Sequence, residues 1–471
     1  GSEASPGIAH AAALVLGLVA LVGGIALAGA HWPAVSPPEG GRAQPDAFAA
    51  FVQVFVLGGA LCALLIAHQA RRDPRPGEVG LVLLAAAGAG LLAQTADTVG
   101  MLAGFAAALL PVWGLAAIRG SAHGREGALK GMVAGSLGMG LFGLGAALLA
   151  ARVGTTDLEA TAHALADIGW IGRDPLLVVG LACLIGGVGC FVAAVPFHMW
   201  FVDVVQSLSI PGALLLSAGV MASGLAAVCR LLLGGFHPVV ASGQGYLSWT
   251  AVLHGLGLAA LLVCNAMALV QKRFKRMTAY LAAGQAGLVL VTLAAVGSIR
   301  ATNPAAAQNA LGGILVFLAV LVVNWVGLFV AAAAIEDSEG RDPAVGELAG
   351  FARCHPWLAV TVGLSLLCMA GMPLTAGFFA RLYLLEAMVV AGWTGAAVMT
   401  ALSLGLVLVM SVGLVGAMVL RPGGSRPEVP ATPATGVVAL LAAVTILLLG
   451  VFPGGVLEIA VRSAGVVLGG G

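Results

Sequence analysis

Seven ionisable side chains lie within or beside the apolar stretches of this chain, where they could move protons. They are Lys130, His198, Asp203, His254, Lys275, Arg381 and Glu386. An imidazole titrates near neutral pH, and the pKa of an amine or a carboxylate changes when a charged neighbour approaches or leaves. Ionisable groups are costly inside a bilayer, by about 2.5–3.5 kcal/mol at its centre, and they commonly line ion paths. We therefore treat these residues as candidates for an ion pathway.

Three of these candidates follow prolines that interrupt apolar sequence. His198 and Asp203 come after Pro196, and His198 could either relay protons or bond to the carbonyl groups that the proline leaves unpaired. Arg381 follows a Gly-Met-Pro break near the middle of a long apolar segment. Its side chain cannot easily reach a membrane surface from there, so we expect a buried polar role. Glu386 lies about 140° further round a helix, so we expect it and Arg381 to have different partners.

Simpler alternatives exist for the remaining candidates. Lys130 begins an apolar span, so its amine could either extend to the membrane surface or face a buried hydrated path. His254 lies among leucines and glycines, which favours a hydrogen-bonded core histidine over a proton relay. Lys275 belongs to the basic turn Lys272-Arg-Phe-Lys-Arg276. Anchoring of a cytoplasmic loop is the favoured explanation of this turn, and proton input is the alternative.

The composition predicts an all-α polytopic membrane protein, whose helices must position these side chains. Hydrophobic residues make up 60% of the 471 positions, charged residues only 9%, and the mean hydropathy is +1.07. A net charge of +1 without a long basic run argues against a nucleic-acid partner. The seven cysteines are scattered without a CxxC pair, and no nucleotide-binding fingerprint is present. We therefore expect no cofactor and no metal in this chain, and no direct binding of NADH.

Charged clusters and Gly/Pro breaks divide the chain into about 13 apolar spans of membrane-crossing length. Their predicted limits are 8–30, 47–70, 78–95, 97–118, 127–152, 174–199, 209–234, 248–271, 277–299, 308–335, 356–392, 394–420 and 435–452. The sixth span contains Pro196, and the eleventh is interrupted by Met369–Gly377. Two broken helices in distant parts of one apolar chain are typical of inverted repeats. Lys and Arg are more frequent in loops after even-numbered spans, which predicts a cytoplasmic N-terminus and an external C-terminus.

Four segments resemble the antiporter-like subunits of respiratory complex I. Val195–Trp200 with Asp203 is similar to that family's A-P-F-H-x-W-x-x-D, and Ala268–Tyr280 to its A-L-x-Q-x-x-x-K-R-x-x-A-Y. Leu367–Tyr383 is similar to L-A-G-I-P-P-T-A-G-F-F-x-K-x-Y, and Gly127–Lys130 followed by Gly154–Asp157 also fits. These matches occur in order over about residues 75–420, and their residues resemble those of subunit N more than those of subunits L or M.

The resemblance implies two inverted five-helix repeats, each with one broken helix and one proton half-channel. It divides the chain into N-terminal helices (1–74), a first antiporter-like half (75–235), a second half (236–420), and a C-terminal helix and tail (421–471). It also implies a bacterial cytoplasmic membrane location. The implied partners are the lipid bilayer and other membrane-arm subunits of an NADH–quinone oxidoreductase.

The residues that carry protons in this family are largely replaced. Ala106 stands where the family has a glutamate, Phe191 and Met221 where it has lysines, and Gln285 where a histidine is usual. Lys130 matches directly, whereas Arg381 stands at the position of the last channel lysine. The usual pair works because a carboxylate changes the lysine's pKa, which alanine and phenylalanine cannot reproduce, and arginine stays protonated.

Three hypotheses follow from this pattern. The favoured one is an N-like subunit with lost or degenerate proton conduction and a mainly structural role. The second is an active subunit with a rearranged path through His198, Asp203, His254 or Glu386. The third places the same fold in a membrane hydrogenase, a cation/proton antiporter or an inorganic-carbon uptake complex, which the neighbouring subunits would decide.

Overall fold

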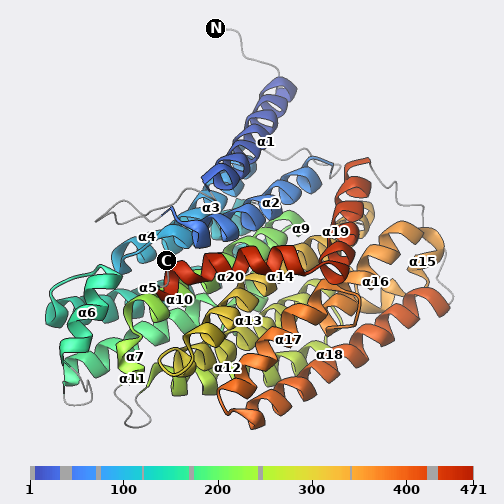
Figure 1. Cartoon of the computed structure of the whole chain (residues 1–471). Coiled ribbons are helices and arrows are strands. Elements are labelled where there is room, and N and C mark those ends of the chain that lie inside the picture. Colours follow the sequence, from blue (N-terminus) through green and yellow to red (C-terminus); the bar gives the residue numbers. More distant parts are fainter. Residues whose placement is uncertain are drawn as a thin grey trace, which may run out of the picture.

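The chain folds as a bundle of helices (Figure 1). The computed structural model describes residues 6–31, 45–69, 76–118, 121–168, 174–241, 248–339, 342–421 and 433–469. Among these residues the extended pairings are two isolated bridges, Asp97–Asp157 and Arg273–Ala344. The prediction of an all-α membrane fold is therefore confirmed.

The helices follow one another with short connections. The first part of the chain forms α1 (Pro6–His31), α2 (Ala47–Gln69), α3 (Pro76–Gln94), α4 (Thr98–Ile118), α5 (Ala122–Val153), α6 (Leu158–Ile168), α7 (Pro175–Phe191), α8 (Met199–Ser207), α9 (Ile210–Leu214), η2 (Leu215–Val220), α10 (Met221–Arg230), η3 (Leu231–Gly235) and α11 (Pro238–Ala241). The rest forms α12 (Trp249–Leu269), α13 (Phe274–Ile299), α14 (Pro304–Glu339), η4 (Val345–Leu348), α15 (Phe351–Cys354), α16 (Pro356–Ala370), α17 (Ala376–Val390), α18 (Thr394–Leu420), α19 (Pro433–Val451) and α20 (Gly454–Leu468).

Ten of these segments in the described residues are long and apolar enough to cross a membrane. Three shorter apolar helices, Leu14–Ala30, Pro175–Phe191 and Pro356–Ala370, lie at the first, sixth and eleventh predicted spans. The chain is thus a multi-pass membrane protein, while the number 13 stays a prediction. The two spans predicted to be broken are interrupted in the structure. The helix of span 174–199 ends at Phe191, and span 356–392 is two helices, α16 and α17.

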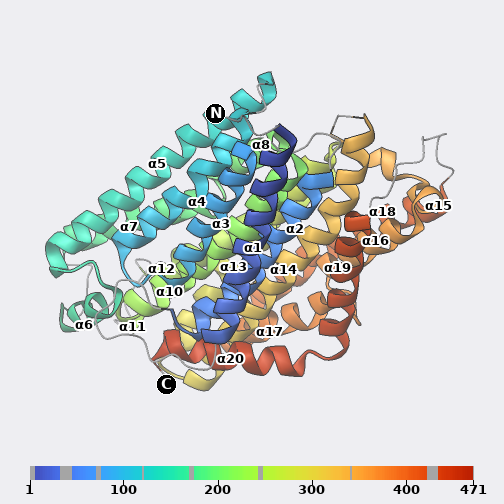
Figure 2. The same cartoon turned by 90° about the horizontal axis from the view of Figure 1, so that it is seen from above.

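The most apolar helices form the centre of the bundle. The most apolar stretches within Ile210–Gly235 and Phe274–Ile299 are entirely buried by their neighbours, and that within Pro304–Ala333 is 94% buried. By contrast, only a third of α5 and of α18 is buried, and Figure 2 shows these two helices on the outside of the bundle. A helix that is apolar all round is stable inside a bundle, whereas an outer apolar face requires lipid or another subunit.

Glycines allow the outer helices to pack closely on their neighbours. A Cβ atom at Gly257 of α12 would lie 2.8 Å from the Gly287 carbonyl oxygen of α13, and one at Gly287 would lie 2.6 Å from the Gly257 carbonyl oxygen. Such contacts leave no room for a side chain, so both positions require glycine. Close backbone approach therefore fixes α12 against the buried α13.

Candidate functional site

The first predicted break is a loop between α7 and α8. Helix α7 ends at Phe191, and the loop contains a cis peptide bond before Pro196. The indole Nε1 of Trp200 donates a hydrogen bond to the Cys190 carbonyl oxygen at 2.9 Å. Because this bond uses a carbonyl near the end of α7, Trp200 holds the start of α8 against the end of α7.

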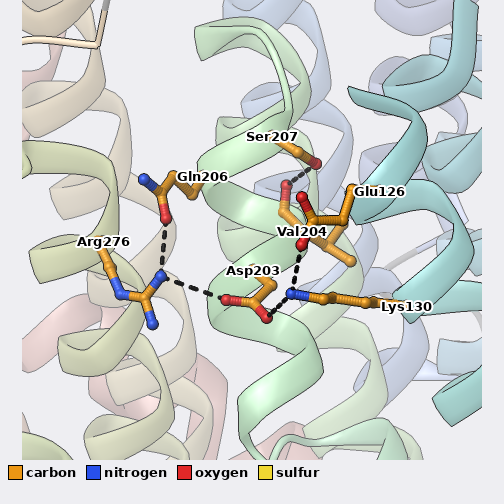
Figure 3. Close-up of polar contacts among 7 residues, drawn as sticks. All are labelled: Glu126, Lys130, Asp203, Val204, Gln206, Ser207 and Arg276. Carbon is orange, nitrogen blue, oxygen red and sulfur yellow. Dashed lines mark hydrogen bonds and ion pairs between the residues drawn. The ribbon is translucent and has the colours of Figure 1, made fainter. Parts of the chain in front are cut away.

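An ion network joins α8 to the helices on both sides (Figure 3). Lys130 Nζ lies 2.9 Å from Asp203 Oδ2 and 2.8 Å from Glu126 Oε1. On the other side of α8, Arg276 Nη1 lies 3.3 Å from Asp203 Oδ1 and donates to Gln206 Oε1 at 2.9 Å. These residues line a cavity of about 200 Å³. Asp203 is therefore the centre of the network, with one cation on each side.

The Lys130 side chain is 46% exposed. The sequence allowed two positions for this amine, at the membrane surface or facing a buried hydrated path. The structure lies between them, because the side chain is half-exposed and two carboxylates hold it. An exposed ion pair contributes at most about 1 kcal/mol. The network thus orients α5, α8 and α13 more than it stabilises them.

Lys275 is buried, and its role in the structure is a hydrogen-bonding one. Its Nζ donates to the Leu208 carbonyl oxygen at 2.9 Å. That carbonyl lies in the link between α8 and α9, where a buried acceptor needs a donor. His198, at the end of the first break, is buried, with 8% of its surface exposed. The centroid of its ring lies 6.0 Å from that of Tyr280 on α13.

Aromatic side chains fill the position of the first expected lysine. The ring of Phe191 stacks on Phe105 of α4 with centroids 3.9 Å apart, and Phe142 of α5 lies 6.0 Å from Phe191. Phe191 and Met221 are both buried, at 6% and 5% exposure. Ala106, which replaces the glutamate, is the neighbour of Phe105 in α4. The middle of the first half is therefore lined by apolar groups at all three positions.

The second predicted break lies between α16 and α17. Gly371 ends α16 with φ of +77°, and its N–H donates to the Cys368 carbonyl oxygen at 3.1 Å. This left-handed conformation is the usual helix end that favours glycine. A Cβ atom at Gly377 would lie 1.9 Å from the same carbonyl oxygen. Glycine at both positions therefore allows the two helix ends to meet.

Arg381 of α17 bridges the two helix ends at this second break. Its Nη1 donates to the carbonyl oxygens of Cys368 at 2.9 Å and Gly377 at 3.1 Å, and its Nη2 donates to Gln285 Oε1 at 2.9 Å. The guanidinium also lies over the Phe317 ring, 5.1 Å from the centroid. Arg381 is 3% exposed. The side chain is thus fixed by neutral acceptors, two of them main-chain carbonyls at the break.

The last two candidates have other surroundings. His254 is half-buried on α12, and its ring packs edge-on against Trp393 with centroids 4.4 Å apart. Glu386 is exposed on α17. Arg381 and Glu386 thus have different environments, as their angular separation predicts. No group of three or more metal-ligating side chains occurs among the described residues, and the predicted absence of a cofactor stays a prediction.

Several polar partners in the structure are not among the predicted candidates. Glu126, Gln206 and Arg276 complete the ion network, and Asp46 pairs with Arg230 at 2.7 Å in the interior. Asp46 precedes an apolar run, which is a signal for a helix N-cap. Glu126 and Lys130 are four positions apart, a spacing that places them on one helix face. The pairing of Gln206 with Arg276 joins residues 70 positions apart and leaves no local pattern.

The chain resembles known proteins over nearly its whole length. Residues 95–407 match the family described as NADH:quinone oxidoreductase/Mrp antiporter, transmembrane. The NADH-quinone oxidoreductase subunit N of Gemmatimonas aurantiaca is 30% identical over 462 residues, covering 95% of this chain and 84% of that protein. Subunit N 2 of Rhizobium meliloti is 28% identical over 457 residues, with 96% and 90% coverage.

Solved structures share the fold. A chain of respiratory complex I from Thermus thermophilus with bound aureothin superposes with a TM-score of 0.78 and 26% identity, covering 96% of this chain and 95% of that one. A chain of the Mrp complex from Dietzia sp. DQ12-45-1b gives a TM-score of 0.83 at 20% identity, with 98% and 93% coverage. The chain belongs to the NADH:quinone oxidoreductase/Mrp antiporter transmembrane family, and within it resembles the subunit N of complex I.

Proposed function

We propose that this chain is the N-like membrane-arm subunit of an NADH–quinone oxidoreductase of the complex I type. In this role it lies in a bacterial cytoplasmic membrane, with its N-terminus in the cytoplasm and its C-terminus outside. Its neighbours are other membrane-arm subunits, and residues 75–235 and 236–420 are its two antiporter-like halves. The relatives named subunit N and the likeness to the Thermus thermophilus complex support this assignment.

Within that assembly the subunit is mainly a structural link, with the usual first half-channel closed to protons. The observation that carries this is the packing of Phe105, Phe142 and Phe191 where the family has a titratable lysine. A proton wire needs water molecules, and each internal water needs two to four polar partners. Stacked rings supply none of these partners, and Met221 adds another buried apolar side chain further along.

The second half supports the same role through a different residue. Arg381 occupies the position of a channel lysine, yet its guanidinium stays protonated and is held by Cys368, Gly377 and Gln285. A group that neither releases its proton nor changes partners cannot relay protons. It instead donates hydrogen bonds to a carbonyl oxygen at the end of α16 and to one at the start of α17, and so joins the two helix ends.

Proton pumping per electron pair in the reconstituted assembly tests this proposal. Lys130→Ala and Arg381→Ala are compared with Lys272→Ala, which removes an exposed lysine from the basic turn. We expect all three to pump as the wild type does when the amount of assembled complex is equal. A large loss in Lys130→Ala or Arg381→Ala, with the complex intact, would refute the passive role.

A rearranged proton path is the second candidate. Buried polar atoms with no partner among the described residues favour it, among them Gln285 Nε2, Asn265 Oδ1 and Ser217 Oγ. Atoms of this kind commonly bind internal water. A density map of the assembly that resolves waters decides between the two. A continuous water chain from Asp203 across the midplane would favour conduction, and a dry centre around Phe191 would exclude it.

A further inference from the structure

A cavity of about 360 Å³ lies where several membrane spans end on one side of the protein. The spans Ile210–Gly235 and Phe274–Ile299 finish beside it, and α6 and the end of α20 form its other walls. Its volume is within the range of about 300–1,000 Å³ that small-molecule sites occupy. None of the seven ion-pathway candidates lines it.

Basic side chains dominate the polar part of this cavity. Arg230, Arg300, His163 and His237 face it, together with one carboxylate, Glu159, which is exposed at the start of α6. The charge of Arg230 is compensated by Asp46 at 2.7 Å. Besides that pair, the lining carries the positive charge of Arg300 and the negative charge of Glu159, and the two histidines add positive charge when protonated.

Two main-chain carbonyl oxygens hold the Arg300 guanidinium in place, and neither carries a negative charge. Its Nη2 donates to the Leu468 carbonyl oxygen at 3.1 Å, and its Nη1 donates to the Leu233 carbonyl oxygen. Both acceptors are neutral, and Arg300 is only half-buried at the end of α13. A fixed guanidinium at the edge of a cavity is the group that proteins most often use to bind phosphate.

The charge of Arg300 also affects the protonation of His237. Its Nδ1 lies 3.3 Å from the Gly234 carbonyl oxygen, so its Nε2 is the nitrogen available to the cavity. Burial, and then the positive charges of Arg300 and His163, lower the pKa of His237. An anion between these groups would oppose both effects, so anion binding and protonation of His237 favour each other.

Apolar side chains complete the cavity. Leu158 of α6 and Val466 and Val467 of α20 also line it. Bases at the end of membrane spans, combined with an apolar wall, suit a phosphate group that carries hydrocarbon. We propose that this cavity is a phosphate-binding site, which takes either the headgroup of an anionic phospholipid or a soluble phosphate ion.

Binding measurements on the purified, delipidated assembly test the site. One arm titrates phosphatidylglycerol in a phosphatidylcholine nanodisc and counts bound lipid by native mass spectrometry. The other arm measures equilibrium binding of radiolabelled inorganic phosphate. Three variants are compared, namely Arg300→Gln, His237→Gln and the control Arg462→Gln, whose arginine is 79% exposed on α20.

We expect Arg300→Gln to weaken binding about tenfold or more, since it removes a charge-assisted hydrogen bond, while Arg462→Gln leaves it unchanged. In the wild type, binding of phosphatidylglycerol, whose phosphodiester keeps one negative charge over this range, tightens as the pH falls from 8 to 6, and His237→Gln removes most of this dependence. His237→Gln keeps a donor for Gly234, so it remains informative if Arg300→Gln does not assemble.

The two arms separate the sources of the phosphate. Saturable binding of phosphatidylglycerol but not of inorganic phosphate identifies a lipid headgroup site, and saturable binding of inorganic phosphate but not of phosphatidylglycerol identifies a site for a soluble ion. Saturable binding of both identifies a phosphate site that accepts either source. No saturable binding in either arm, or equal binding by the wild type and by both cavity variants, would overturn the proposal. The structural role proposed above does not depend on this result.

Discussion

Replacing Asp46 by asparagine should destabilise the protein by about 3–5 kcal/mol, which is the cost of leaving a buried charge without its partner. Asp46 is fully buried and the Arg230 side chain is 5% exposed, with Oδ1 and Nη2 only 2.7 Å apart. The same Oδ1 accepts the Ala49 N–H at 2.8 Å as the cap of α2. Asparagine also caps helices well, so this substitution removes the charge and keeps the cap.

A double variant separates the charge effect from packing. Asp46→Asn combined with Arg230→Met removes both charges and keeps a long side chain over the Phe48 ring, where the guanidinium lies 5.0 Å from the centroid. Replacing a buried ion pair by apolar groups is commonly neutral. We therefore expect the double variant to recover most of the stability that Asp46→Asn loses.

The free energy of unfolding is measured by denaturant titration of the purified full chain in lipid–detergent micelles, followed by circular dichroism. The control is Glu458→Gln, which breaks an exposed pair with Arg462 at 65% and 79% exposure. It should stay within about 0.5 kcal/mol of the wild type. If Asp46→Asn were equally mild, or if the double variant were the less stable of the two, the assignment of this pair as a buried structural anchor would be wrong.

Three further predictions concern other contacts. Phe191→Ala should lower the free energy of unfolding by about 3–5 kcal/mol, because it leaves a cavity beside two rings; a loss below about 1 kcal/mol by the same titration would contradict the packing. Lys275→Met should cost about 1–3 kcal/mol by leaving the Leu208 carbonyl unpaired, whereas exposed Lys272→Met should cost little. The hydrogen bond from Arg152 lowers the pKa of the Asp174 carboxyl. The contribution of this hydrogen bond to the free energy of unfolding is therefore fully present above the usual carboxyl pKa of about 3.9. It is lost as the pH falls through the lower pKa of Asp174 in the folded protein. Melting temperatures of the wild type and Asp174→Asn should accordingly differ at pH 6 and converge towards pH 3, and parallel curves would contradict this.

Local chemistry made the two breaks predictable. A proline has no N–H and restricts the residue before it, so Pro196 had to interrupt a helix. The Gly-Met-Pro sequence at Gly371 combined a helix-ending glycine with a proline. Both interruptions occur in the structure, at Val192–His198 and Gly371–Thr375. The prediction that Gln285 and Phe191 replace titratable groups also required only the order of residues.

The partners of the charged side chains could not be predicted in the same way. Lys130 and Asp203 are 73 positions apart, Arg381 and Gln285 are 96 apart, and Asp46 and Arg230 are 184 apart. Such distances carry no periodic signal, because the packing of whole helices decides which side chains meet. The half-exposed position of Lys130 has the same origin, since it depends on how α8 and α13 pack beside α5.

The contacts at the start of α13 link the two halves of the chain mechanically. Lys275 holds the Leu208 carbonyl, and Arg276 holds both Asp203 and Gln206. All three acceptors belong to α8 or to the link that follows it, whereas both cations belong to α13 in the second half. A displacement of α8 by a neighbouring subunit must therefore either break these bonds or move α13 with it. Since nearly all of α13 is buried, that movement would pass to the centre of the bundle.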